Sequence, residues 1–329
     1  NSIQFEYNMN LSDLPWLAKI YKKINFNNLP HGIILNGPEG LGKFILGNEI
    51  ARNLIVNNND SKSINLFNLN SHPDFLFLNK DKILTRHISF RDKEWDEELG
   101  NRNVIDFLSM TPSISSNKVV LINNAHTMNE VSQNALLKSL EEPSLNSYII
   151  LITNRSNSLL QTIYSRCQIF NMPSLTDEEI NNWLVLRGIS DFNIKDFPSY
   201  ISPIKILNDI ENDQHMVFKD FIKLMKKFLS NQAHSKQILQ HLSSYEIDLI
   251  TKINYLIEFL KILLRSKILN EKLSGLYEDF NNSNFSTLKV SNIINDLHNL
   301  RFEYFKVPQI NENHVFNYYF SELKNSIKL

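Results

Sequence analysis

The sequence is poor in cysteine, with Cys167 as the single thiol among 329 residues. That excludes an internal disulfide and a zinc site built on several cysteines. Long apolar runs are missing too, because none approaches the roughly 20 residues that a membrane-spanning helix requires. Residues 1–10 lack the basic start and apolar stretch of a secretory signal. We therefore expect a cytoplasmic protein with no membrane partner and no zinc.

The net charge of the chain is also close to zero. The 34 Lys and Arg residues almost balance the 35 Asp and Glu residues, which leaves a formal net charge of -1. No overall field attracts the chain to nucleic acid, so any DNA contact must be local or shared with partner proteins. With 42% hydrophobic and 21% charged residues, the composition is that of a folded globular protein, and the length favours two or three domains.

What the chain does have is a series of short apolar runs between longer amphipathic stretches. The runs are residues 32–36, 74–78, 118–122, 148–153 and 168–171. Such runs are typical of strands covered on both faces, so the sequence predicts an α/β fold with a five-stranded parallel sheet and flanking helices. Residues 129–142 place Val131, Ala135, Leu136 and Leu140 at helical spacing, which predicts a helix packed on this sheet.

The pattern changes after residue 172. Thr176 and Glu179 form the capping-box signature of a helix start, and a small helical domain is predicted for residues 173–213. From residue 214 to residue 329 only amphipathic helical stretches follow, which predicts an all-α third domain. The expected organisation is therefore a core domain at 1–172 and two helical domains at 173–213 and 214–329.

The most informative segment lies between the first predicted strand and the helix after it. Gly37, Gly40, Gly42 and Lys43 match a phosphate-binding loop. In such a loop backbone amides surround phosphates at a helix N-terminus, and the lysine adds a positive charge. The next position is usually Ser or Thr, whose hydroxyl binds magnesium. Here it is Phe44, which has no oxygen to offer.

The third predicted strand also lacks groups that an ATPase would use. It should end in an acidic pair that holds magnesium and activates water, but Asn123 and Asn124 follow it. An amide carries no negative charge and cannot act as a base near neutral pH. We therefore expect no intrinsic ATPase activity, weak or absent nucleotide binding, and no bound metal.

Two further motifs complete a recognisable pattern. Residues 134–143 read Asn-Ala-Leu-Leu-Lys-Ser-Leu-Glu-Glu-Pro, and residues 165–167 read Ser-Arg-Cys. Together with the phosphate loop, these blocks have the order and the spacing of the AAA+ clamp-loader family, which the chain resembles up to about residue 210. The resemblance implies an AAA+ core, a small lid domain and a helical collar domain through which subunits assemble.

Within this family the chain is similar to the delta prime class of bacterial DNA polymerase III. The similarity rests on His72-Pro73-Asp74, on residues 106–112 and on the lost metal and base residues. The gamma/tau motor class would have Ser or Thr at position 44 and an Asp-Glu pair at 123 and 124. The four-cysteine zinc module of many relatives is missing as well, which is a second reason to expect no zinc.

The resemblance implies roles for three side chains. Arg166 matches the arginine finger that projects in trans into the ATP site of the adjacent motor subunit, although it could instead pair only with a local carboxylate. Asn154 matches the position that senses the nucleotide phosphate, with a structural hydrogen bond as the alternative. Lys205 matches the second sensor, but Ile204 stands where a glycine is common.

The resemblance also implies partners. These are gamma/tau and delta subunits, in a hetero-oligomer that opens the beta sliding clamp and places it on primed DNA. The candidates for DNA-backbone contacts are Arg86, Arg91, Lys93 and Arg102, for which a solvated basic stretch is the commoner explanation. The chain would contribute binding energy and an arginine in trans, not bond chemistry of its own.

Two rival functions stay open. An active AAA+ ATPase, either a motor subunit or a helicase loader, would need Asp106 or Glu141 in place of the missing acidic pair. Neither residue stands at a predicted strand end. A stand-alone DNA-binding protein would use the core only as a scaffold, which the near-neutral charge and the presence of Arg166 disfavour.

Overall fold

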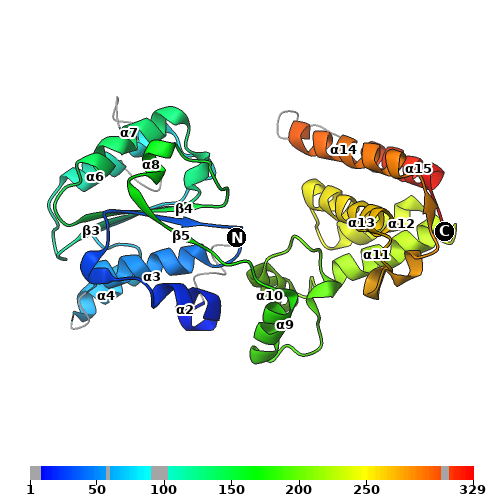
Figure 1. The fold of residues 1–329 in the computed structure, drawn as a ribbon, viewed down its shortest axis with the longest axis horizontal. Coiled ribbons are helices and arrows are strands. Elements are labelled where there is room, and N and C mark those ends of the chain that lie inside the picture. Colours follow the sequence, from blue (N-terminus) through cyan, green and yellow to red (C-terminus); the bar gives the residue numbers. More distant parts are fainter. Residues whose placement is uncertain (1–8, 57–59, 90–102, 305–310) are drawn as a thin grey trace. The chain divides into compact units, whose positions relative to one another are not determined.

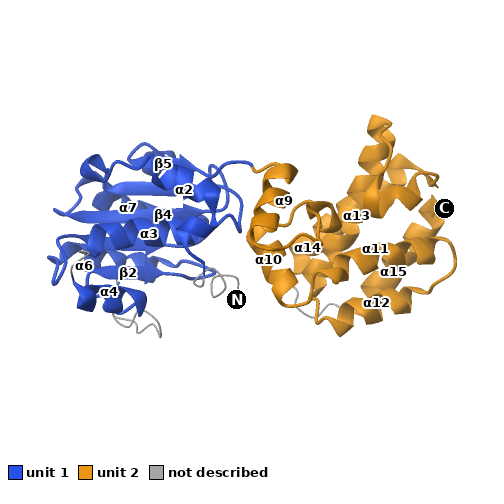
Figure 2. Cartoon of the chain, turned by 90° about the horizontal axis from the view of Figure 1, so that it is seen from below, with its two compact units in different colours: residues 1–174 blue, residues 175–329 orange. Residues whose placement is uncertain are grey.

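The computed structural model of the chain describes residues 9–56, 60–89, 103–304 and 311–329. The chain divides into two units, Asn1–Ser174 and Leu175–Leu329, which Figure 2 shows in different colours. The first unit holds a sheet with helices on both faces, and the second is mostly helical.

The first unit is built on one parallel sheet. In chain order its strands are β1 (Gly32–Asn36), β2 (Phe75–Leu78), β3 (Lys118–Ile122), β4 (Ser147–Thr153) and β5 (Cys167–Asn171). Across the sheet their order is β2-β3-β4-β1-β5. The predicted α/β class with five parallel strands is confirmed, and each predicted strand agrees with an observed one to within one residue at either end.

Helices cover both faces of this sheet. They are α2 (Pro15–Tyr21), α3 (Lys43–Ile55), α4 (Ser61–Asn68), α5 (Thr85–Ile88), α6 (Val104–Ser109), α7 (Glu130–Glu141) and α8 (Gln161–Tyr164), with the 3-10 turns η1 (Leu11–Asp13), η2 (Phe26–Asn28) and η3 (Ala125–Thr127). In Figure 1, α2, α3 and α4 lie on one face and α6, α7 and α8 on the other. The central strands are thereby kept from water on both sides, which explains their unbroken apolar sequences.

Helix α3 lies close against its face of the sheet. At Gly47, in the middle of this helix, an added Cβ would stand 2.9 Å from a side-chain carbon of Leu121 and 3.3 Å from one of Leu35. Glycine normally weakens a helix, but here it permits the close approach. That approach fixes where the amino end of α3, and with it the phosphate loop, meets the sheet.

Helix α7 packs on the opposite face, as its apolar spacing predicts. Leu136 and Leu140 are buried in the cluster that includes the sheet side chains. The prediction that Val131 shares this buried face is wrong, since Val131 is 59% exposed. Val131 lies in the first turn of α7 and falls in line with Asn134 and Lys138, which are also exposed.

The strand order brings three loops to one edge of the sheet. β1 and β4 are parallel neighbours, with Asn36 opposite Thr153. The phosphate loop after β1 and Asn154 after β4 therefore meet there, and Asn123 follows β3, the next strand along. In open parallel sheets, ligands bind at the carboxyl ends of the strands. This edge is therefore where a nucleotide site is expected.

The second unit is mostly helical. Its elements are α9 (Asp177–Leu186), η4 (Ile194–Asp196), α10 (Pro203–Glu211), α11 (Met216–Leu229), α12 (Ser235–Ser244), α13 (Leu249–Leu269), η5 (Gly275–Phe280), α14 (Thr287–Tyr304) and α15 (Glu312–Ser326). The predicted capping box is present at α9: the Glu179 amide donates to Oγ1 of Thr176 at 3.2 Å, and the Thr176 amide donates to Oε2 of Glu179 at 2.9 Å. None of the helices described combines the length and apolar character needed to cross a membrane.

A short strand pair is the one departure from the all-helical prediction within the described part of this unit. β6 (Asn284–Phe285) and β7 (Ile327–Lys328) pair in antiparallel fashion. Two-residue segments are too short to show the alternation that marks a strand in sequence.

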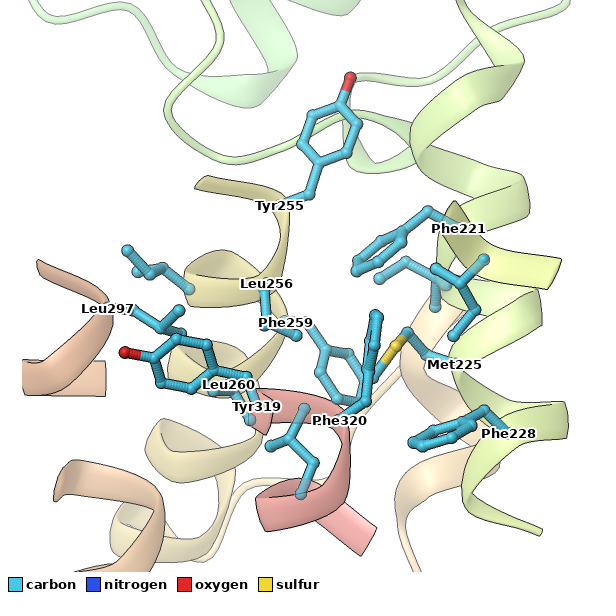
Figure 3. Close-up of a cluster of buried hydrophobic side chains, with 14 of the residues drawn as sticks. Phe221, Met225, Phe228, Tyr255, Leu256, Phe259, Leu260, Leu297, Tyr319 and Phe320 are labelled. Carbon is cyan, nitrogen blue, oxygen red and sulfur yellow. The ribbon is translucent and has the colours of Figure 1, made fainter. Parts of the chain in front are cut away.

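The core of the second unit is rich in aromatic side chains. Figure 3 shows Phe221 and Phe228 of α11 near side chains of α13 and α15. Phe228 meets Phe320 with ring centroids 5.3 Å apart, and Phe259 meets Phe280 at 5.0 Å, both in edge-to-face geometry. Such pairs add orientational preference to the burial of large apolar areas.

Two polar contacts join the segment before residue 213 to the helices after it. The backbone amide of Ser199 donates to Oε1 of Glu258, a buried residue of α13, at 2.8 Å. Lys219 of α11 forms an ion pair of 3.4 Å with Asp196. The predicted small domain and the predicted third domain thus lie in one unit, and the finer boundaries at 172 and 213 stay predictions.

A buried carboxylate ties the loop before β3 to the start of β2. Asp74 accepts backbone hydrogen bonds from Ser113 at 2.7 Å, Ile114 at 2.8 Å and Ser115 at 2.9 Å. Burial raises the pKa of Asp74, but the hydrogen bonds from these three residues outweigh it, so that the pKa lies below its usual value. The Asp74 amide in turn donates to Nδ1 of buried His72 at 3.1 Å. The His-Pro-Asp segment therefore has a structural role.

Replacing Asp74 by Asn should lower the free energy of unfolding by about 1–3 kcal/mol, because the new amide group would face backbone donors and leave some of them without an acceptor. Asp60→Asn is the matched control, since Asp60 caps α4 through the Lys62 amide and Asn caps a helix equally well. Urea unfolding measures the difference. Equal stability of the two variants would contradict this account of Asp74.

The lowered pKa of Asp74 also predicts an acid-dependent loss of stability. Because the pKa is lower in the folded chain than in the unfolded chain, the contribution is complete above the unfolded value of about 4 and is lost as the pH falls through the folded value. The stability gap between the wild type and Asp74→Asn should therefore be widest at neutral pH and shrink in acid. Urea unfolding over a pH series measures the gap, and a gap that does not change with pH would refute the prediction.

Candidate functional site

The loop between β1 and α3 has the backbone shape that its glycines predict. Gly37, Gly40 and Gly42 have φ angles of 150°, 70° and 81°, values that residues with a side chain rarely adopt. A Cβ at Gly37 would also stand 2.7 Å from Cβ of Met172. Gly42 is the N-cap of α3, so the loop leads directly into a helix N-terminus.

Lys43 closes this loop on itself. It is the first residue of α3 and is only 4% exposed. Its Nζ donates to the carbonyl oxygen of Gly37 at 2.8 Å and to that of Pro38. The ammonium group thus bonds to uncharged acceptors of the loop's own backbone, and a phosphate would have to compete with them.

Phe44 occupies the position of the expected magnesium-binding hydroxyl. Its side chain is 5% exposed and packs against Phe77 of β2, with ring centroids 5.1 Å apart. The residue that departs from the ATPase pattern therefore belongs to the hydrophobic contact between α3 and the sheet. A hydroxyl could be restored here only with a loss of packing.

The two amides after β3 bond to the segment that follows β2. Nδ2 of Asn123 donates to Oδ1 of Asn79 at 3.0 Å, and Nδ2 of Asn124 donates to the carbonyl oxygen of Lys80 at 3.4 Å. Asn124 has a φ angle of 53°, a conformation that Asn tolerates better than most residues. The amide pair thus links the ends of two neighbouring strands, a task that needs no charge.

A histidine that sequence reasoning misses joins this edge. Nδ1 of His126 accepts from the backbone amide of Asn154 at 3.4 Å. Burial lowers the pKa of His126, and the charges of Arg155 and Lys43 lower it further against an opposing effect of Glu39. The structure thus brings Lys43, His126 and Asn154 together. The signal for His126 in the sequence is its place shortly after β3, at the edge where the phosphate loop lies.

Arg166 stands immediately before β5, in contact with two helices. Its Nη1 donates to the carbonyl oxygen of Thr162 at 2.8 Å and to Oγ of Ser165 at 3.2 Å. Its Nη2 lies 2.7 Å from Oε1 of Glu141, the last residue of α7. The side chains of Arg166 and Glu141 are 34% and 47% exposed. A local carboxylate partner is therefore present, on a surface open to solvent.

The strand register separates Arg166 from the phosphate loop of its own chain. β1 and β5 pair in parallel, with Gly32 opposite Cys167 and Asn36 opposite Asn171. Arg166 therefore lies beside the beginning of β1, whereas the phosphate loop follows its end. The five residues of β1, at roughly 3.3 Å each, separate the two by about 16 Å. An arginine side chain is too short for that distance, so these groups belong to separate sites.

The remaining sequence candidates lie elsewhere in the chain. Lys205 of α10 forms a 2.5 Å ion pair with Asp209, one turn further along the same helix. Arg86 lies in α5. The other basic candidates, Arg91, Lys93 and Arg102, lie outside the described residues.

The carboxylates considered for an active ATPase do not follow strands. Asp106 lies in α6, where its Oδ2 accepts from Nδ2 of Asn103 at 2.7 Å. Glu141 ends α7 and bonds to Arg166. Among the residues that the structure describes, no three His, Cys, Asp or Glu side chains are grouped closely enough to hold a metal ion. The expected absence of a metal stays a prediction.

Known proteins share these features with the chain. A family model described as "DNA polymerase III, delta subunit" matches residues 15–176. A "DNA polymerase III subunit delta'" of Haemophilus influenzae is 33% identical over 180 residues, which is 52% of this chain and 52% of that protein. One of Buchnera aphidicola subsp. Schizaphis graminum is 28% identical over 242 residues, 69% of each chain. The chain is thus similar to delta′ subunits of DNA polymerase III.

The residues that this family model matches include the candidate site from Gly37 to Arg166. The chain spans about half the length of most of the curated relatives that it matches, for example 52% of the Haemophilus protein. Among solved structures, a "gamma subunit-related protein" of Thermotoga maritima aligns over 95% of this chain and 99% of its own, with a TM-score of 0.44 and 16% identity.

Phe44→Ser should lower the free energy of unfolding by about 3 kcal/mol or more, because it removes a buried ring and leaves a cavity beside Phe77. The matched control in the same unit is Leu145→Ser, where the wild-type side chain is 90% exposed and the change should stay within about 0.5 kcal/mol. Urea unfolding compares the two. If Phe44→Ser is no less stable than the control, Phe44 is not part of the core.

Proposed function

We propose that the chain works as the delta′ subunit of a DNA polymerase III clamp loader and does not hydrolyse ATP itself. It assembles with gamma/tau and delta subunits, and the assembly, driven by ATP, loads the beta sliding clamp onto primed DNA during replication. Arg166 acts in trans as the arginine finger in the ATP site of the adjacent motor subunit. The observation that carries the proposal is the position of Arg166, one strand length from the chain's own phosphate loop.

An arginine that cannot reach its own phosphate loop, yet is exposed, is suited to a neighbour's nucleotide. Arg166 keeps 34% of its side chain open to solvent. A guanidinium presents forked donors that match phosphate oxygens, and an arginine supplied in trans stabilises the charge of the transferring phosphoryl group. Such an interaction is stronger in the transition state than in the ground state, so its loss should act mainly on the rate.

The chain's own phosphate loop supports a subunit that does not hydrolyse ATP. Lys43 bonds to loop carbonyls, Phe44 lies in the core, and Asn123 and Asn124 link two strand ends. At the positions where P-loop ATPases supply a hydroxyl and carboxylates, this chain offers magnesium no charged ligand and water no base. We therefore expect nucleotide binding to be weak or absent, and neither magnesium nor zinc to be bound.

DNA binding in this proposal belongs to the assembled complex. A net charge of -1 gives the isolated chain no long-range attraction to a phosphate backbone. Contacts to primed DNA and to the clamp would therefore be made jointly with the gamma/tau and delta subunits. The work of this chain is then to complete an ATP site and a ring, through binding energy alone.

Reconstitution of the chain with gamma/tau and delta tests the proposal through DNA- and clamp-stimulated ATP hydrolysis. The isolated chain should hydrolyse no ATP. Arg166→Ala should lower the rate of the assembly at least about tenfold, or ~1.4 kcal/mol in barrier height, with a smaller change in the KM for ATP. The reason is that the missing guanidinium stabilises charge that develops during the reaction.

Two variants sharpen this test. Arg166→Lys keeps the charge but loses the forked donors, so it should recover only part of the rate. Arg52→Ala removes an exposed arginine of α3 whose ion-pair partner is Glu49, and the assembly should then hydrolyse ATP at the wild-type rate. ATP hydrolysis by the isolated chain, or a normal rate for the Arg166→Ala assembly, would sink the proposal and favour an active AAA+ ATPase.

A further inference from the structure

Arg166 has a defined resting place in this chain. Its Nη1 bonds to Thr162 and Ser165, and its Nη2 bonds to Glu141. The two terminal nitrogens, which are the donors best placed to meet phosphate oxygens, are therefore both engaged. Thr162 and Ser165 belong to α8 and its C-cap, whereas Glu141 comes from α7. Of these three acceptors, Glu141 is the one that carries a charge.

We propose that Glu141 is a positioning residue that holds Arg166 in a folded-back position until the polyphosphate bound to the neighbouring subunit displaces it. The inference rests on the proposed trans role of Arg166 and adds a second residue to it. When the neighbour binds ATP, the guanidinium exchanges one anionic partner for another of higher charge. Glu141 thereby makes the outward position of Arg166 depend on a nucleotide in the adjacent site.

The exposure of the pair suits it to such an exchange. A buried ion pair is hard to break, because each charge would be left without a partner away from water. The side chains of Arg166 and Glu141 are 34% and 47% exposed, and ion pairs of this kind are weak. A nucleotide can therefore displace Glu141, yet without nucleotide the carboxylate still favours the folded-back position.

Glu141→Gln tests the inference because it keeps the size of the side chain and removes its charge. In the reconstituted assembly the KM for ATP should fall about two- to fivefold, the range expected for the loss of an exposed ion pair, while kcat stays the same. A larger fraction of Arg166 would then be available before ATP arrives. Because salt screens exposed charges, the difference from the wild type should shrink as ionic strength rises.

Two comparisons connect the effect to Arg166. Glu142 is the next residue, equally charged and exposed, and it forms no ion pair with any residue that the structure describes. Glu142→Gln should therefore leave the KM at its wild-type value. In an Arg166→Ala background, Glu141→Gln should change nothing further, because the two residues act through one contact.

The resting contact can also be measured in the isolated chain. The guanidinium NMR signals of Arg166, assigned by their loss in Arg166→Ala, should shift in Glu141→Gln and stay in place in Glu142→Gln. Unmoved signals, an unchanged or raised KM in Glu141→Gln, or an effect that persists in Arg166→Ala would each overturn the inference. If Arg166→Ala slows ATP hydrolysis by the assembly but Glu141→Gln leaves its KM and kcat at the wild-type values, the inference fails and the proposed function stands. An Arg166→Ala assembly of normal rate overturns the proposed function, and the inference with it.

Discussion

The parallel pairing of β1 with β5 is the constraint on which both candidate sites depend. It sets the phosphate loop at the end of β1 and Arg166 beside its beginning. The pairing is tight at that beginning, because a Cβ on Gly32 would stand 2.7 Å from Sγ of Cys167 and 3.2 Å from the carbonyl oxygen of Arg166. Burial raises the pKa of the Cys167 thiol to about 12, so the thiol stays protonated and serves packing. The backbone before β5 is thus fixed by the sheet, and only the arginine side chain is left to move.

At the other end of β1, the groups that ATP chemistry would use are engaged in holding the structure together. Lys43 bonds to the carbonyl oxygens of its own loop, and Phe44 fills space beneath α3. The amides after β3 connect two strand ends, and His126 accepts from the backbone of Asn154. These contacts lie near the carboxyl-end edge of the sheet. A nucleotide would have to replace several of them at once without the magnesium ligands that normally repay the exchange.

Local signals in the sequence predicted most of this arrangement. The apolar runs predicted the strands, because side chains covered on both faces leave no polar alternation. The glycines predicted the loop, because its positive φ angles exclude most side chains. The exposure of Val131 could not be predicted in this way. Helical spacing shows which residues share a face of a helix, but it does not show how far the covering sheet extends along that face. The contacts of Glu141 and His126 could not be predicted either, because their partners come from other segments of the chain. The sequence therefore offers Glu141 only as a possible catalytic carboxylate, whereas the fold makes it the partner of Arg166.

Lys43 and Arg166, the two cations at opposite ends of β1, differ in how readily an anion from outside the chain can replace their present acceptors. Lys43 is 4% exposed, and the two acceptors described for it, the carbonyl oxygens of Gly37 and Pro38, lie in its own loop. A phosphate could take their place only if this loop rearranged. Arg166 is 34% exposed, and its charged acceptor sits at the end of a surface helix. Replacing that acceptor needs only a side-chain rotation and a stronger anion. Arg166 thus lies at the surface, whereas Lys43 is held within its own loop. The proposed function, in which the chain responds to a neighbour's ATP without using ATP of its own, requires this arrangement.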